Sequence, residues 1–191
     1  MNVIFLDFDG VLDTNYYKSY EQVEEKIKIL ADICHTYDAK IVIEAAAKAA
    51  IDEELLEIDE DAKWVQFLFE MFKKYDIEVI GRTPNCKKRV ESNHNIFYSM
   101  WKEDEIRLYL FRHPEIEHYC IIDDDDLRYY KRSKFKSDLN KVRDHLVIPE
   151  DFLEDNPTQE GLLPKHKEEV GEILKKDNNI RKLVLKKRKI N

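Results

Sequence analysis

Near-continuous runs of apolar residues alternate along the chain with longer segments in which apolar residues recur every three or four positions. Five runs have the length and β-branched content of buried strands: Val3–Leu6, Lys40–Glu44, Ile77–Gly81, His118–Ile122 and His145–Ile148. Such runs are typical of strands that are covered on both faces, as in a parallel sheet.

The segments between these runs predict helices. The first begins at Ser19 or Glu21, and its apolar side carries Val23, Ile27, Leu30, Ala31 and Cys34. Three more are expected at Ala62–Lys74, Lys102–Arg112 and Lys165–Lys175. Strands that alternate with helices predict an α/β fold with a doubly wound parallel sheet of about five strands and no large cap domain.

Other segments have weaker patterns. Residues 44–50 are strong helix formers and look like the rigid helical spacers of linkers, while residues 82–101 show little clear periodicity. Residues 129–141 predict a loop with some helix, and 150–164 a long loop. We expect one domain over residues 1–175 and a basic C-terminal tail over 176–191.

Composition supports a folded globule of ordinary size. The chain has 191 residues, of which 43% are hydrophobic, and its four glycines and five prolines argue against a turn-rich β-sandwich. The net charge of −8 is uneven, since residues 52–61 hold seven acids and residues 181–189 hold six bases. The basic tail could touch phosphates or a membrane, although such tails are usually only solvated ends.

The cysteines and the N-terminus bear on the cellular compartment. Cys34, Cys86 and Cys120 have no metal-like spacing, and Cys120 lies within an apolar run, as expected of a small core residue in a reducing compartment. The chain opens on a core strand without a signal peptide, and no apolar run is long enough to span a bilayer. We therefore expect a cytoplasmic protein with no membrane partner; its oligomeric state stays open.

Acidic residues follow two of the expected strands. Asp7 and Asp9 come directly after the first strand and point the same way, and Gly10 then allows a sharp turn. The fourth strand runs into Asp123–Asp126, which alone would be read as a solvated acidic turn. Carboxylates that converge at the carboxyl ends of neighbouring strands are costly without a cation or a shared proton, and Mg²⁺ prefers such oxygen ligands. The two segments together predict a metal site at the ligand-binding edge of the sheet.

These motifs resemble those of the haloacid dehalogenase-like (HAD) superfamily of phosphohydrolases. Phe5–Leu12 matches its first motif, a strand followed by Asp-x-Asp-Gly, and Ile121–Asp124 looks like its fourth. Further segments fall in the order seen in small capless members associated with RNA-repair proteins: 39–43, 101–106, 119–126, 146–148 and 161–162. The resemblance covers roughly residues 1–175.

The resemblance implies a role for each matching residue. Asp7 would be the nucleophile that forms an aspartyl-phosphate, and Asp9 the general acid and then the general base. The Asp7 carboxylate, the Asp9 carbonyl and Asp123 or Asp124 would hold Mg²⁺. Lys102 best fits the basic residue of the third motif; its rivals Arg82, Lys88 and Arg89 are, taken singly, more often solvated surface charges.

The second motif departs from the family pattern. The family places Ser or Thr after the second strand, where it donates to a phosphoryl oxygen, but this chain has Glu44-Ala45-Ala46-Ala47 there. Losing one such donor typically costs about 2.7–4 kcal/mol of transition-state stabilisation, and Glu44 would repel a phosphate. Either backbone amides and Lys48 replace the hydroxyl, or turnover is poor. The expected substrate-binding residues are Gly10, Ala45, Lys48, Arg82 and Lys88.

Two kinds of function follow. The first is a Mg²⁺-dependent phosphatase acting on a phosphomonoester, such as a nucleotide or a polynucleotide phosphate end. The basic residues of segment 82–94, with Phe97, Tyr98 and Trp101, could then contact nucleic acid, although ordinary core packing is the more common role of such aromatics. The second is a binding or regulatory protein that keeps the fold and has lost the second motif. A phosphotransferase or dehalogenase would differ only in its acceptor and leaving group.

Overall fold

The computed structural model describes residues 1–13, 19–45, 60–84, 88–92, 95–99, 102–124, 142, 144–149 and 160–178, with only the backbone described for 60–62, 88–92, 95–99 and 104. Five strands form one parallel sheet in the order β3-β2-β1-β6-β7. They are β1 (Asn2–Leu6), β2 (Ala39–Ile43), β3 (Val79–Arg82), β6 (His118–Ile122) and β7 (Leu146–Val147). This arrangement confirms the predicted doubly wound α/β fold.

The chain reverses its direction of travel across the sheet between β1 and β6. From the central strand β1 it moves through β2 to the edge strand β3, and it later returns to pair β6 with the other side of β1. Ligands bind at such switch points in open α/β sheets, just beyond the carboxyl ends of the strands. The acids that follow β1 and β6 are therefore neighbours, as the sequence predicted.

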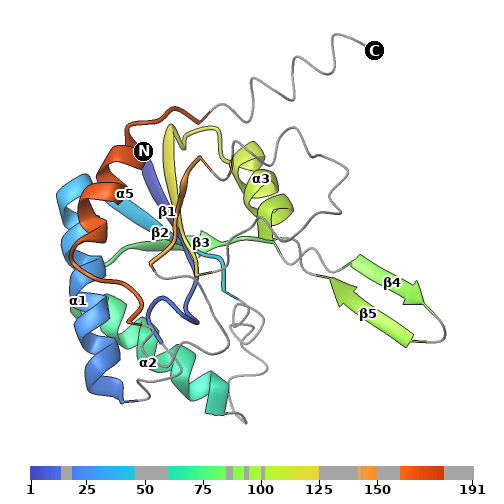
Figure 1. The fold of residues 1–191 in the computed structure, drawn as a ribbon, viewed down its shortest axis with the longest axis horizontal. Coiled ribbons are helices and arrows are strands. Elements are labelled where there is room, and N and C mark those ends of the chain that lie inside the picture. Colours follow the sequence, from blue (N-terminus) through green and yellow to red (C-terminus); the bar gives the residue numbers. More distant parts are fainter. Residues whose placement is uncertain are drawn as a thin grey trace.

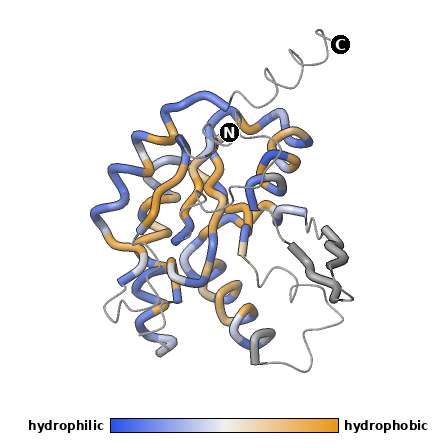
Figure 2. Tube along the Cα trace, turned by 45° about the vertical axis from the view of Figure 1, so that its right-hand side comes forward, coloured by the Kyte–Doolittle hydropathy of each residue, from blue (hydrophilic) through white to orange (hydrophobic). Residues whose placement is uncertain are grey.

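Helices cover both faces of the sheet (Figure 1). The helices α1 (Tyr20–Tyr37), α2 (Glu60–Lys74) and α5 (His166–Leu174) lie on one side, and α3 (Lys102–Arg112) lies on the other. Side chains from alternate strand positions fill the two layers. Ile4, Leu6, Ile41 and Ile43 pack toward α1, whereas Val3, Phe5 and Val42 pack toward α3 with Ile106, Tyr109 and Leu110. Figure 2 shows the apolar residues gathered along the strands and the hydrophilic residues on the outer turns of the helices.

The first helix is delimited by local chemistry at both ends. Ser19 lies in an extended conformation and its hydroxyl accepts a hydrogen bond from the backbone N–H of Gln22, which satisfies a donor that the first turn leaves open. The helix ends where Asp38 adopts a left-handed conformation and its N–H bonds to the carbonyl of Cys34. The apolar positions predicted from helical spacing, including Val23, Ile27 and Leu30, are buried.

One element was not predicted. Residues 82–101, which show little periodicity, contain an antiparallel hairpin of β4 (Lys88–Ser92) and β5 (Asn95–Ser99). In Figure 1 this hairpin lies apart from the five-stranded sheet, beyond α3. β4 has a single apolar residue, Val90, so the hairpin lacks the paired apolar runs that marked the other strands. Within the described parts of the chain there is no large cap domain.

The expected boundaries of α3 and β6 match those observed, and the other expected boundaries differ by at most two residues. The expected spacer at 44–50 and the loops at 129–141 and 150–164 lie wholly or mostly outside the described residues, as does the tail beyond residue 178. No helix among the described residues combines the length and the hydropathy that crossing a bilayer requires.

Candidate active site

Four residues stand side by side just beyond the carboxyl ends of the strands. Backbone hydrogen bonds continue the sheet ladder by one step: Thr83 N donates to Ile43 O at 3.0 Å, Glu44 N to Leu6 O at 2.8 Å, Asp7 N to Ile122 O at 3.0 Å and Asp123 N to Val147 O at 3.3 Å. We call Thr83, Glu44, Asp7 and Asp123, in this order across the sheet, the terminal row. Three of its four members carry carboxylates.

The terminal row projects toward the α3 face of the sheet. Side chains alternate along a strand, and the residues two positions before Glu44, Asp7 and Asp123 are Val42, Phe5 and Ile121, which all belong to the core layer beneath α3. The first residue of α3 is Lys102. The fold therefore brings a cation at the start of a helix to the acids at the ends of the central strands.

Lys102 contacts both central carboxylates of the row. Its Nζ lies 2.5 Å from Asp7 Oδ2, and 3.1 Å and 2.9 Å from the two oxygens of Asp123. Only 15% of the Lys102 side chain is exposed, against 5% for Asp7 and none for Asp123. Burial alone would lower the pKa of Lys102, but the charges of Asp123 and Asp7 outweigh it and raise that pKa well above its ordinary value. The lysine stays protonated at any physiological pH.

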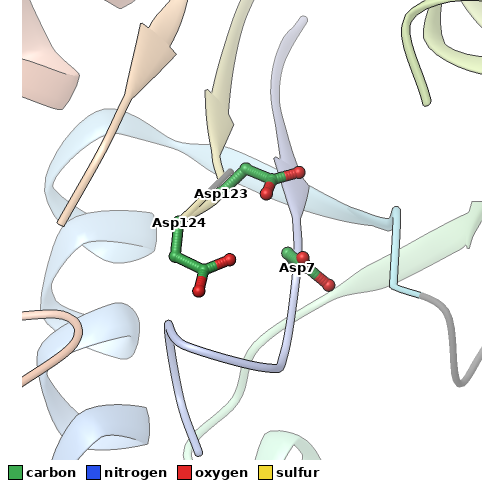
Figure 3. A group of neighbouring side chains, drawn as sticks. All are labelled: Asp7, Asp123 and Asp124. Atoms are coloured by element: carbon green, nitrogen blue, oxygen red, sulfur yellow. The ribbon is translucent and has the colours of Figure 1, made fainter. Parts of the chain in front are cut away.

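Asp124 completes a group of three carboxylates with Asp7 and Asp123. One oxygen from each lies within 4.8 Å of the others, and all three residues are buried (Figure 3). Gly10 makes room for Asp124: a Cβ at Gly10 would come within 1.9 Å of Asp124 Oδ2, and its φ of 72° favours glycine independently. The turn at Gly10 that follows Asp7 thus shapes the position of Asp124.

This donor set fits a hard divalent cation. Carboxylate oxygens are the ligands that Mg²⁺ prefers, and water fills the remaining positions of such sites. Asp7 Oδ1 already accepts a hydrogen bond from the backbone N–H of Phe8 at 2.8 Å, which fixes the carboxylate. Because Gly10 has no Cβ, the carboxylate of Asp124 can lie close to the backbone there. Asp7, Asp123 and Asp124 are the residues that could hold the ion.

Asp9 lies in a tight turn after the strand. The carbonyl of Phe8 accepts from the amides of Leu12 and Asp13 at 2.9 Å and 3.0 Å, and Gly10 N donates to Asp13 O at 2.6 Å. This turn leaves Asp9 exposed, unlike Asp7. Its side chain is not part of the three-carboxylate group. An exposed carboxylate two residues from a buried one is suited to exchange protons with solvent or with a leaving group.

The other expected binding residues are not all brought to this site. Arg82 ends β3 and is exposed, and Ala45 is buried in the core layer beneath α1 and α2, on the face opposite the terminal row. Lys48 lies outside the described residues, and so do the side chains of Lys88 and Arg89. Among the described residues, Lys102 is the basic residue whose side chain forms an ion pair with Asp7.

The terminal row also holds a residue that sequence reasoning missed. Thr83 is buried, and its hydroxyl donates to Oε2 of Glu44, which is itself fully buried. The expectation that Glu44 simply faces a phosphate therefore omits its partner on the next strand. The signal for Thr83 was present, because it lies two residues after the third apolar run, Ile77–Gly81, while Glu44 ends the second.

A known family matches most of the chain. Residues 3–153 match the model of a family described as the HAD domain in Swiss Army Knife RNA repair proteins. The match spans the terminal row, Gly10, Asp124 and Lys102. No curated protein and no solved structure gave a match.

Proposed function

Because the chain belongs to the family of HAD domains found in Swiss Army Knife RNA repair proteins, we propose that it is a Mg²⁺-dependent phosphohydrolase that cleaves a phosphomonoester through an aspartyl-phosphate. The observation that carries this proposal is the buried Asp7 carboxylate, held by Lys102 beside Asp123 and Asp124. Such a carboxylate is fixed in place and close to positive charge, as a nucleophile that attacks an anion must be.

The chain's own residues supply most of the reaction. An oxygen of Asp7 attacks phosphorus, and a bond forms as the bond to the leaving oxygen breaks. Asp9, on the exposed turn, gives a proton to the leaving oxygen and then takes one from the water that hydrolyses the aspartyl-phosphate. Lys102 holds the Asp7 carboxylate in place and offers positive charge to the phosphoryl oxygens. A bound Mg²⁺ would neutralise further charge on those oxygens.

The lack of a large cap domain among the described residues favours a large substrate. The described residues contain no large cap over the terminal row, and enclosed pockets are the usual means of binding small metabolites. The family description names RNA repair proteins, so a nucleotide or polynucleotide phosphate end is the substrate class we propose. The basic and aromatic residues around the β4–β5 hairpin would then contact the nucleic acid.

One observation favours a second candidate function. Where the resemblance leads one to expect a Ser or Thr donor, this chain places Glu44, whose carboxylate accepts a hydrogen bond from Thr83. A protein with this fold and weak turnover would bind phosphorylated ends or regulate a partner without rapid hydrolysis.

The test is phosphate release with Mg²⁺ from p-nitrophenyl phosphate, nucleotides and oligonucleotides phosphorylated at either end. Wild-type protein is compared with Asp7→Asn, and with Asp32→Asn as a matched surface control, since Asp32 is exposed on α1 and pairs with Lys167. Release that Asp7→Asn abolishes and Asp32→Asn preserves supports the hydrolase. Binding of phosphorylated oligonucleotides without Asp7-dependent release supports the second candidate.

A further inference from the structure

Glu44 occupies the place in the terminal row next to the nucleophile. Its backbone N–H bonds to Leu6, the residue before Asp7, so the two carboxylates extend from adjacent strands. Neighbouring strands lie about 4.8 Å apart, and both residues project toward α3. Glu44 is fully buried and Thr83 is nearly so.

The bond between Thr83 and Glu44 uses the hydroxyl's only hydrogen. Thr83 Oγ1 donates to Glu44 Oε2, and an ionised carboxylate has no hydrogen to donate. When Glu44 is ionised, neither side chain offers a donor to a phosphoryl oxygen in this arrangement. What the row places beside Asp7 is a carboxylate, fixed in position by Thr83.

We propose that Glu44 is ionised and is a specificity-determining residue that disfavours phosphoryl groups with two negative charges and favours those with one. This inference rests on the proposed function, since it concerns the substrate of the same site. The preferred class is then a phosphate ester with a singly charged phosphoryl group, such as a phosphodiester or a monoester that has taken up a proton.

Simple electrostatics gives the direction. A buried carboxylate is screened weakly by solvent and salt, so its charge acts on a neighbouring anion over several ångströms. Its interaction with a phosphoryl dianion is about twice that with a monoanion at the same position. Lys102 and a bound cation attract both kinds of substrate, whereas a hydroxyl in place of Glu44 would add no such discrimination.

The covalent step is the same for both kinds of ester. The Asp7 oxygen bonds to phosphorus as the bond to p-nitrophenolate breaks, and the electron pair leaves with the phenolate. Water then hydrolyses the aspartyl ester, releasing phosphate from p-nitrophenyl phosphate or methyl phosphate from methyl p-nitrophenyl phosphate. The two substrates share a leaving group and differ by one charge at about pH 8, above the second phosphate pKa of about 6.

The experiment measures kcat/KM for both esters with Mg²⁺ in wild type, Glu44→Gln and Thr83→Val. Glu44→Gln keeps the shape and an acceptor for Thr83 but removes the charge. We expect it to raise the ratio of dianion to monoanion kcat/KM on the order of tenfold. Thr83→Val removes the hydrogen bond and keeps the carboxylate, so it should not raise this ratio. Circular dichroism and thermal melting establish that each variant is folded.

Calorimetric binding of orthophosphate and dimethyl phosphate gives a readout that needs no turnover. A gain in the affinity of Glu44→Gln for orthophosphate relative to dimethyl phosphate supports the inference, even if neither ester is hydrolysed. The inference is overturned if Glu44→Gln changes neither the ratio of kcat/KM values nor the ratio of binding affinities by more than about twofold. An equal rise in Thr83→Val also overturns it, because displacement rather than charge would then be the cause. Absence of Asp7-dependent turnover in wild type and Glu44→Gln instead contradicts the hydrolase proposal alone.

Discussion

Replacing Lys102 by Met tests the electrostatics of the site most severely. The substitution keeps the apolar stem of the side chain and removes the ammonium that contacts Asp7 at 2.5 Å and Asp123 at 2.9 Å and 3.1 Å. Because both carboxylates are 5% exposed or less, solvent cannot replace the lost charge. Removing one partner of a buried ion pair typically costs about 3–5 kcal/mol.

That cost is a large part of the stability of an ordinary domain, which is about 5–15 kcal/mol. For a chain of this size each kcal/mol lowers Tm by roughly 2–4 °C, so a fall on the order of 10 °C is expected without metal. Mg²⁺ should restore much of the loss, since it supplies positive charge to the same carboxylates. It should therefore stabilise Lys102→Met by more than it stabilises wild type.

The assay is thermal and urea unfolding in EDTA and in Mg²⁺, with Lys167→Met as the matched control. Lys167 forms a single ion pair with Asp32 at 2.6 Å on the surface, and such pairs contribute about 0–1 kcal/mol. The double variant Asp7→Asn with Lys102→Met should recover part of the stability. Two results would refute the role given to the buried charges. One is that Lys102→Met is no less stable than Lys167→Met in EDTA, and the other is that Mg²⁺ stabilises Lys102→Met no more than it stabilises wild type.

Three further predictions follow from the same contacts. Gly10→Ala should weaken Mg²⁺ binding by about tenfold or more in calorimetry, because its Cβ displaces Asp124. Gly161→Ala, also at positive φ, is the control for the backbone strain of about 1–2 kcal/mol that either substitution introduces. Burial lowers the pKa of His145 from 6.5, so the unfolded chain gains a proton first as the pH falls, and the free energy of unfolding should decrease below about pH 6.5. His145→Phe, which can keep the stacking on Tyr119, should flatten this pH dependence in urea titrations at pH 5.5–7.5. Glu44→Gln should shift selectivity toward phosphoryl dianions, as measured by the two nitrophenyl esters.

The main sheet and its helices could be predicted from the sequence because their signals are local. Val3–Leu6 and His118–Ile122 are apolar enough to mark buried strands, and the spacing of Val23, Ile27 and Leu30 marks a helix. The β4–β5 hairpin could not be predicted in this way, because it pairs with itself outside the core and needs no long apolar run.

The candidate site was predictable in its parts but not in all its contacts. Asp7 and Asp123 follow strands, so topology alone makes them neighbours. The choice of Lys102 over Arg82 depends on where α3 begins relative to the sheet, a distance that no sequence pattern contains. The pairing of Thr83 with Glu44 depends on the register of β2 against β3, which shifts between Ile41 and Val42. Register between strands is a property of the folded core rather than of either segment.

The most direct test of the proposed reaction is to trap the phosphorylated enzyme. Protein is mixed with p-nitrophenyl phosphate and Mg²⁺, quenched in acid, digested and examined by mass spectrometry, with Asp7→Asn treated in parallel. The proposed mechanism predicts one phosphoryl group on the peptide that contains Asp7, its disappearance when the complex is allowed to turn over, and none in the variant. Phosphate release by wild type with no label on Asp7, or a label that persists in Asp7→Asn, would contradict it.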